Sequence, residues 1–356
     1  MPASSIDTFF ACTIMITLVL AAMVNTSNTL RPSMDNALRE NDSELLRQIS
    51  EHLLQSPGTP TNWGSSKDVV PTSLGLADSN ALIPYALDID KVSRLSNVNF
   101  YSLSYAQLWQ TLSISDISFS IEVRTLFNAS ITLVSMSSGT NETTYQFDVY
   151  THKSGTPVPS NLRGYVIAQD YVNSVTSRTS TDGHASISEA IPNSLSGAAI
   201  FVVFAQAQSK NQIVAFNACA FAHNSSEPLP NRTFTQLSPL NHILNVTFTY
   251  PNAEVSKALV LTSSYNFSLT EKNSSGQTVE YEIPRLLDTS LMLLVVTGLN
   301  GSSSFAEWTA YPQVPLTVVA NFEENAETST VSFSYIATIE SVLYEAVTRW
   351  RLTSDV

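Results

Sequence analysis

The chain has 356 residues, of which 43% are hydrophobic and 13% are charged, so it can form two or three domains and is not largely disordered. Lys and Arg total 17 against 30 Asp and Glu, which gives a formal net charge of −13. Because no basic run is present, nucleic acid would be repelled, and we expect no nucleic-acid partner. The two cysteines, Cys12 and Cys219, are in dissimilar surroundings and form no CxxC motif, which excludes a disulfide framework.

The N-terminus carries a charge-free apolar run from Phe9 to Val24. Extended back to Ile6, the run is interrupted only by Asp7 and approaches the roughly 20 residues that a spanning helix needs. No Lys or Arg precedes Arg31, unlike in a cleaved signal peptide, and no face is polar, unlike in a helix at the surface of a core. We predict a transmembrane anchor helix over 1–30 that meets membrane lipid through residues 6–24, with a cleaved signal and a buried core helix as the alternatives.

Asn-x-Ser/Thr sequons recur downstream of this run and predict an extracellular, glycosylated body. A surface rich in Ser, Thr and Asn also produces such triplets by chance. Asn25 and Asn41 lie close to the apolar run. The glycosylation candidates in the body are Asn128, Asn141, Asn224, Asn231, Asn245, Asn266, Asn273 and Asn300.

An amphipathic pattern follows the apolar run. Apolar residues recur at helical spacing from Met34 to Leu54, with charged residues between them, and Ser56-Pro57-Gly58 ends the pattern. We therefore predict a stalk helix within 31–56. Residues 57–115 are predicted to be an irregular connector with one short helix at Ser104–Leu112.

The hydrophobic period changes to two from Asp116 onward. Ile117, Phe119, Ile121 and Val123 alternate with polar residues, and the same pattern recurs to a last strand at Val342–Leu352. Short strands separated by turn signals predict a mainly β fold with two β-sandwich domains, 116–222 and 223–356. The core predicted for the first sandwich is Phe119, Ile121, Phe147, Val149, Val166, Val202 and Phe204.

Three segments resemble archaeal type IV pilin-like surface proteins over roughly the first 95 residues. They are Leu54-Leu-Gln-Ser-Pro-Gly-Thr-Pro-Thr-Asn-Trp63-Gly, Leu74-Gly-Leu-Ala-Asp78 and Asp90-Lys91-Val-Ser-Arg-Leu95. The resemblance implies an N-terminal helix with an acid at mature position five. Asp7 would hold that position if processing left Ala3 first, and it is then an assembly candidate. The leader Met1-Pro2 is very short and lacks the usual basic residue, and an acid at a helix N-terminus is also favoured by the helix dipole.

A second stretch, about 116–222, resembles Ig-like and carboxypeptidase-regulatory-like modules. The segments that carry the resemblance are Tyr145-Gln-Phe-Asp-Val149, Gly155-Thr-Pro-Val158, Thr181-Asp-Gly183 and Ile200-Phe-Val-Val-Phe-Ala205. The resemblance implies an Ig-like β-sandwich used as a surface spacer or binding platform.

The sequence contains no HExxH, GxSxG or P-loop motif, so we expect no catalytic residue, cofactor or metal site. Asp88-Ile-Asp90 begins like a calcium loop but lacks the remaining ligands, and fits a pair of solvated turn acids. Asp182-Gly183 indicates a turn, Cys219 a small buried side chain, and Glu323–Glu327 a charged loop.

Taken together, the sequence predicts a single-pass, membrane-anchored, extracellular surface protein of archaeal pilin-like type, structural or adhesive and non-catalytic. Its expected partners are membrane lipid, further copies through the N-terminal helix, and a cell-surface or glycan ligand. One alternative is a filament subunit that assembles through the N-terminal helix. The other is a cell-surface carbohydrate-active enzyme.

Overall fold

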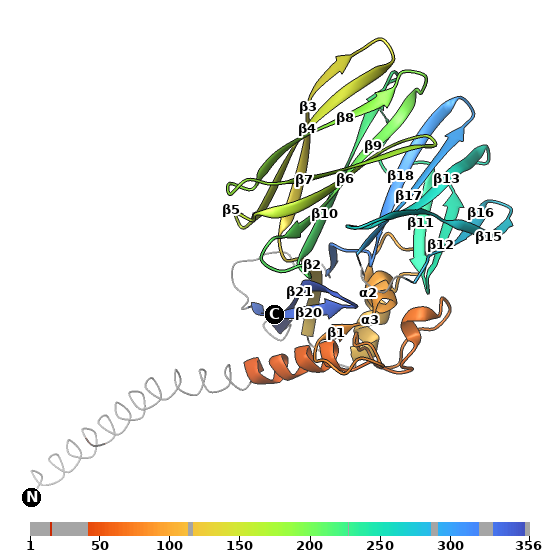
Figure 1. Ribbon diagram of the computed structural model, residues 1–356. Coiled ribbons are helices and arrows are strands. Elements are labelled where there is room, and N and C mark those ends of the chain that lie inside the picture. Colours follow the sequence, from red (N-terminus) through yellow and green to blue (C-terminus); the bar gives the residue numbers. More distant parts are fainter. Residues whose placement is uncertain are drawn as a thin grey trace, which may run out of the picture. The chain divides into compact units, whose positions relative to one another are not determined.

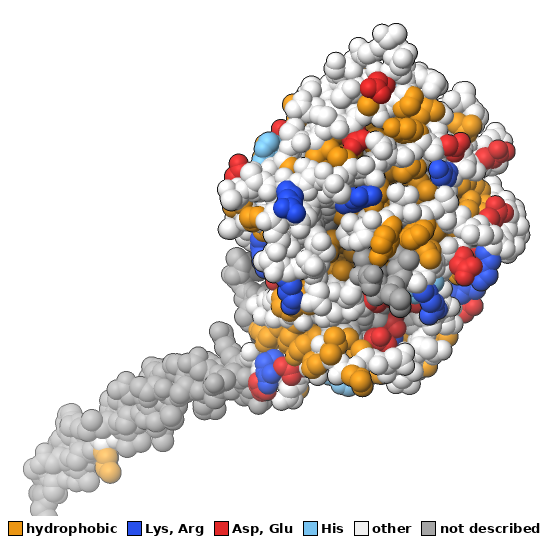
Figure 2. All heavy atoms as spheres, viewed as in Figure 1, with side chains coloured by type: hydrophobic (Ala, Val, Ile, Leu, Met, Phe, Trp, Pro, Cys, Tyr) orange, Lys and Arg blue, Asp and Glu red, His pale blue; other side chains and the backbone are white. Residues whose placement is uncertain are grey.

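The computed structural model describes residue 15 and residues 42–112, 117–226, 228–285, 291–319 and 330–352 (Figure 1 and Figure 2). The chain divides into two compact units, Met1–Glu51 and His52–Val356. No helix within the described residues is both long and apolar enough to cross a membrane. Apart from Met15, the predicted anchor over 1–30 lies outside the described residues. The stalk helix predicted within 31–56 is present over 42–55.

The described body is mainly β, as the alternating pattern predicts. A base sheet has the order β1-β20-β21-β2-β19 and joins strands from both ends of the chain. Its strands are β1 (Ala86–Leu87), β20 (Thr330–Ile339), β21 (Val342–Leu352), β2 (Ile117–Thr125) and β19 (Leu316–Val319). Helix α3 (Tyr105–Leu112), predicted at Ser104–Leu112, contacts this sheet: the Tyr105 ring stacks on Phe119 with centroids 4.9 Å apart.

The middle of the chain forms a sandwich of two antiparallel sheets. Sheet 1 contains β3 (Asn128–Ser138), β4 (Glu142–Lys153), β5 (Thr156–Pro157) and β8 (His184–Pro192). Sheet 2 has the order β10-β9-β6-β7, with bounds Val214–His223, Gly197–Ala207, Ser160–Ala168 and Tyr171–Arg178. Phe147 of β4 stacks on Phe201 of β9 at 4.1 Å, and Val149 and Val166 belong to the same buried cluster. The predicted core positions Phe147, Val149 and Val166 are confirmed.

Two further sheets follow in the chain. Sheet 3 has the order β14-β13-β17-β18, with bounds Asn266–Ser268, Ala253–Leu261, Met292–Asn300 and Ser303–Tyr311. Sheet 4 has the order β11-β12-β16-β15, with bounds Thr235–Leu240, Ile243–Phe248, Thr278–Glu282 and Thr270–Ser275. Sheet 4 contacts sheet 3 where Phe234 stacks on Phe305 at 5.1 Å.

Sheet 2 is covered on both faces, by sheet 1 on one side and by sheet 3 on the other. The Tyr165 hydroxyl donates to the Thr262 carbonyl at 2.9 Å, and the Ala198 N–H donates to Ser304 Oγ at 2.9 Å. Every residue of β9 from Ala198 to Ala205 is buried, and β17 is buried from Met292 to Gly298. Such strands have no polar face, which is why both are continuous apolar runs in the sequence.

Strand pairing departs from the expected first sandwich in two respects. Strand β2, with Phe119 and Ile121, pairs with β21 and β19 in the base sheet, because its partners come from the far end of the chain. Val202 and Phe204 are buried, but they lie on the opposite face of β9 from Phe201, which belongs to the sandwich core. Neighbouring residues of a strand point to opposite faces, and an uninterrupted apolar run does not indicate which face is which.

The connector is more ordered than the predicted irregular stretch. It contains a 3₁₀ turn, η1 (Trp63–Ser65), and helix α2 (Ile89–Leu95), which Asp88 caps by accepting the N–H groups of Asp90 and Lys91 at 2.9 and 3.0 Å. The Lys91 ammonium is buried and donates to the carbonyls of Pro57 (2.9 Å) and Ala77 (2.7 Å). The segments that carry the pilin-like resemblance therefore pack on one another.

Asp90 is not a solvated turn acid. Its carboxylate is buried, and it accepts the Tyr311 hydroxyl at 2.7 Å and the Asn241 N–H at 2.8 Å. Burial raises the pKa of Asp90 above its ordinary value, against the lowering effects of these hydrogen bonds and of Arg285 and Arg94. The carboxylate links α2 to the turn between β11 and β12 and to the end of β18.

Candidate functional site

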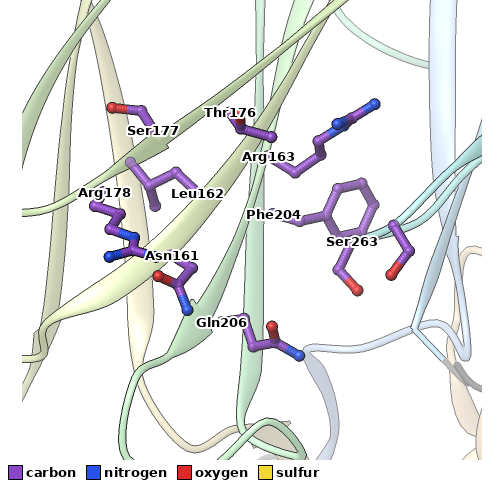
Figure 3. A pocket seen from close by; sticks show the side chains of 10 residues that line it. Asn161, Leu162, Arg163, Thr176, Ser177, Arg178, Phe204, Gln206 and Ser263 are labelled. Carbon is purple, nitrogen blue, oxygen red and sulfur yellow. The ribbon is translucent and has the colours of Figure 1, made fainter.

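A groove of about 590 Å³ opens on the face of sheet 2 that sheet 3 covers only in part (Figure 3). It is lined mostly by polar side chains from β6, β7 and β9 and by the start of the loop between β13 and β14. The lining residues are Asn161, Leu162, Arg163, Thr176, Ser177, Arg178, Phe204, Gln206, Ser263 and Ser264.

Strand register brings the polar residues together. Asn161 on β6 pairs with Arg178 on β7 and with Gln206 on β9, so the three form one row across the sheet. Two residues along β6, Arg163 pairs with Thr176 and Phe204 in a second row on the same face. Arg163 and Arg178 are therefore diagonal neighbours, and residues in that relation are within reach of a shared ligand when their side chains are long.

Arg163 is held in place by two contacts. Its Nη2 donates to Ser174 Oγ at 2.9 Å, and its guanidinium carbon lies 5.4 Å from the centre of the Tyr165 ring. A guanidinium carries five N–H donors. Nη2 donates to Ser174 Oγ, and Nε is buried without a hydrogen-bond partner among the described residues, so a ligand in the groove would meet the Nη groups. Arg163 therefore presents a fixed donor edge at the groove.

Arg178 is exposed and extends on the other side of the opening. Figure 3 shows it beside Asn161, with Arg163 beyond the Phe204 ring and Ser263 on the opposite wall. Neither arginine forms an ion pair with a described carboxylate, whereas Arg47, Arg124 and Arg349 each do. Arg94 and Arg232 also form no ion pair with a described carboxylate, so what distinguishes Arg163 and Arg178 is that both line one groove, in a chain with net charge −13.

The groove has a closed apolar floor. Phe204 forms this floor and is 1% exposed, so it offers no flat surface for stacking. The Leu162 side chain is 3% exposed and belongs to the core between sheets 1 and 2, on the opposite face of β6. Contacts to a ligand would instead come from the guanidinium, amide and hydroxyl groups around the opening. This set donates hydrogen bonds and carries positive charge, and it includes no described carboxylate or histidine that could transfer a proton.

The sites predicted from sequence lie elsewhere. Asp7 lies outside the described residues, as do Asn25, Asn41 and residues 323–327. Asn128, Asn141, Asn224, Asn266 and Asn273 are exposed. Asn231, Asn245 and Asn300 are half-buried. Glycosylation of all these residues stays a prediction.

Two of the half-buried sequons use their amides within the fold. Asn231 Nδ2 donates to the Trp308 carbonyl at 3.0 Å, and its Oδ1 accepts the Trp308 N–H at 2.9 Å. Asn245 Nδ2 donates to the Tyr101 hydroxyl at 2.7 Å. A glycan is attached at Nδ2, so Asn128, Asn141, Asn266 and Asn273 are the better acceptors. Asn224 is exposed, but its Nδ2 donates to the Leu195 carbonyl at 3.3 Å.

The remaining chemical expectations concern single residues. Gly183 has a φ of +76° in a turn closed by its N–H donating to the Ser180 carbonyl at 3.0 Å, which confirms the turn at Asp182-Gly183. Cys219 is half-buried rather than fully buried. Within the described residues, no group of three or more His, Cys, Asp or Glu side chains could hold a metal ion.

Sequence reasoning missed the groove because its residues are spread over four segments. Asn161, Arg178 and Gln206 become neighbours only through strand pairing, and no local spacing reveals that pairing. A weak signal exists: Arg163 and Arg178 belong to a group of only 17 basic residues, and both lie in alternating strands with no acid at the paired positions.

Comparison with known proteins does not identify the chain. No family model matches the sequence, and no curated protein matches it. Among solved structures, HBP35 of Porphyromonas gingivalis shares 15% identity over 51% of this chain and 62% of its own, with a TM-score of 0.19. Red sea bream transglutaminase shares 9% identity over 57% and 32% (TM-score 0.20), and S. aureus TarS shares 8% over 63% and 35% (TM-score 0.17). The chain spans less than two thirds of each of these chains, and such low TM-scores define no shared fold.

Proposed function

We propose that this chain is a membrane-anchored extracellular surface protein, pilin-like at its N-terminus, with a structural or adhesive and non-catalytic body of Ig-like sandwiches. The N-terminus would anchor it to the cell membrane through residues 6–24, with the C-terminal body outside and some exposed sequons glycosylated. Its partners would be membrane lipid, further copies of the chain, and a cell-surface or glycan ligand.

The observation that supports the proposal is the stacking of the four sheets. Strands β9 and β17 are each buried on both faces, so sheets 2 and 3 share an apolar contact. The two sandwiches are therefore not independent domains joined by a flexible linker. Fixed packing of this kind suits a spacer that carries load or holds a binding surface away from a membrane. The groove lies where the two sandwiches meet.

The anchor is tested by detergent phase separation of the full-length chain and of a variant that starts at Arg31. We expect the full-length chain in the detergent phase and the shortened variant in the aqueous phase. The sixteen uncharged residues from Phe9 to Val24 are the physical reason. Full-length protein in the aqueous phase would contradict the proposal. Protease treatment of intact cells, which should digest the body, tests the extracellular placement separately.

The filament alternative is distinguished at Asp7. A carboxylate within an apolar helix needs a partner, and in a filament the free amine of a neighbouring subunit would supply it. Asp7→Ala would then abolish assembly, and mass spectrometry of the extracted protein would find a processed N-terminus. An intact Met1 together with unchanged surface display of Asp7→Ala would favour the anchored monomer. Turnover of surface polysaccharide would favour the enzyme alternative.

A further inference from the structure

We infer that the groove on sheet 2 is a binding site for an acidic oligosaccharide, one whose carboxylates are separated by hydroxyl-bearing carbons. The inference gives a ligand class to the adhesive role and rests on the proposed function for its biological setting.

The charge of the site selects an anion. Arg163 and Arg178 face a common opening, and neither is neutralised by a described carboxylate. Guanidinium groups bind carboxylates through two parallel hydrogen bonds, and such charge-assisted pairs are stronger than neutral ones. Arg163 keeps its donor edge in place through Ser174 and the Tyr165 ring, so binding would cost little side-chain entropy there.

The neutral groups select hydroxyls. Asn161 offers an amide donor and acceptor beside Arg178, and Gln206 offers its Oε1 as an acceptor, because its Nε2 donates to the Asn211 carbonyl at 2.9 Å. Thr176, Ser263 and Ser264 offer hydroxyls around the opening. Amides and hydroxyls that both donate and accept match the vicinal hydroxyls of a sugar. A compact anion such as phosphate would use one guanidinium and leave this second set without partners.

The shape of the site selects an extended ligand. The groove holds about 590 Å³ and is open at the surface, and Figure 3 shows the two arginines on different sides of Phe204. A short oligosaccharide laid across β6, β7 and β9 would contact both arginines together with the amide and hydroxyl groups around the opening. Nucleic acid also has repeated anions, but it has aromatic bases, for which the buried Phe204 offers no stacking surface.

The test is calorimetric titration of the unglycosylated full-length chain in neutral detergent with tetragalacturonate, at a fixed ionic strength of about 0.1 M. The comparison probes are maltotetraose, which is neutral, inorganic phosphate, a tetraglutamate peptide and a short oligothymidylate. We expect tetragalacturonate to bind at least about tenfold more tightly than each of the others, as two charge-assisted contacts plus hydroxyl recognition imply. Equal or tighter binding of maltotetraose, phosphate, tetraglutamate or oligothymidylate would overturn the assignment.

Variants locate the binding. Arg178→Gln removes an exposed charge without a packing role, and we expect it to weaken tetragalacturonate binding about tenfold or more. Arg178→Lys keeps the charge but not the planar donor pair, so its affinity should fall between that of Arg178→Gln and that of the unmodified chain. Lys272→Gln, on exposed β15 of sheet 4, removes the same charge away from the groove and should change affinity less than twofold. Similar losses for Arg178→Gln and Lys272→Gln would show a non-specific charge effect and refute the site.

The outcome of the binding experiment does not depend on the outcome of the membrane-anchor experiment. A chain that partitions into detergent but binds no tetragalacturonate would refute the ligand class and leave the surface-protein proposal standing. A chain that binds tetragalacturonate but partitions into water would keep the site and refute the anchor.

Discussion

At the scale of single residues, position 58 in the segment Ser56-Pro57-Gly58 requires glycine. Its φ is +71°, and a Cβ there would lie 2.6 Å from the Ser73 carbonyl oxygen and 2.8 Å from the Gly75 nitrogen. Gly155 has a similar φ of +81° but has open space around it. The two glycines therefore separate backbone strain from steric overlap.

We predict that Gly155→Ala costs roughly 1–2 kcal/mol of unfolding free energy, the cost of a side chain in the left-handed region. Gly58→Ala should cost about 1–3 kcal/mol more, because surrounding backbone atoms must also move. Urea unfolding of the two variants measures the difference directly. Equal losses would show that the Ser73 and Gly75 backbones yield without cost.

Asp90 gives the body a specific pH dependence. Its folded pKa is raised by burial, so the folded state holds a proton that the unfolded state has lost between the two pKa values. The contribution of this group to stability is thus fully present below the unfolded pKa of about 3.9 and is lost as pH rises through the folded pKa.

We predict that Asp90→Asn removes this loss. The free energy of unfolding of the unmodified chain should decline more, or rise less, between pH 4 and pH 7 than that of the variant. Chemical unfolding at several pH values measures both slopes, and Asp170→Asn, at the exposed turn between β6 and β7, is the control. If the Asp90→Asn curve declines more steeply with pH than the parent curve, the sign is wrong.

At the scale of elements, the contact between β4 and β9 holds the first sandwich together. Phe147 is fully buried and stacks on Phe201, whereas Tyr150 on the opposite face of β4 is 45% exposed. Phe147→Ala should cost roughly 3–5 kcal/mol, as for other buried aromatic residues. Tyr150→Ala, with its ring near His184, should cost less than about 1 kcal/mol. Thermal or urea unfolding checks both, and a small loss at Phe147 would contradict the face assignment.

Sequence patterns predict individual strands well and predict their partners poorly. The alternation in β21 places Tyr344, Ala346, Thr348 and Trp350 on one face, and all four are buried. The same reasoning fails for β9, where Phe201 and Phe204 are equally apolar and face different sheets. Helix α2 has seven residues, too few for a helical period to stand out, although Asp88 was available as its cap.

The groove illustrates the same limit. Its chemistry depends on Asn161, Arg178 and Gln206 lying in one row, which follows from the register of β6 with β7 and β9. A shift by one residue would turn Arg163 into the sandwich core, so register decides whether the site exists. Register depends on how two segments pair, and the sequence of one segment alone does not determine it.

At the scale of the whole molecule, the segments that form the base sheet lie on both sides of the two sandwiches in the sequence. Strand β2 precedes both sandwiches in the chain, and its partners β19 and β21 follow them, so the base sheet joins two segments that the sandwiches separate. Contacts this distant in sequence form slowly, and more readily once the intervening segments are already folded. The sandwiches should therefore be stable without the base sheet.

We predict that a fragment covering 126–312 is monomeric and unfolds in one cooperative transition, because it keeps sheets 1 to 4 together. A fragment covering 126–224 should associate, since removal of sheet 3 exposes Ile167, Ile200, Val202 and Phe204 on one side of sheet 2. Light scattering after gel filtration measures both masses, and urea unfolding measures cooperativity. A monomeric, cooperatively unfolding 126–224 would mean that sheet 2 tolerates an uncovered apolar face, and the stack would then be two independent domains in contact.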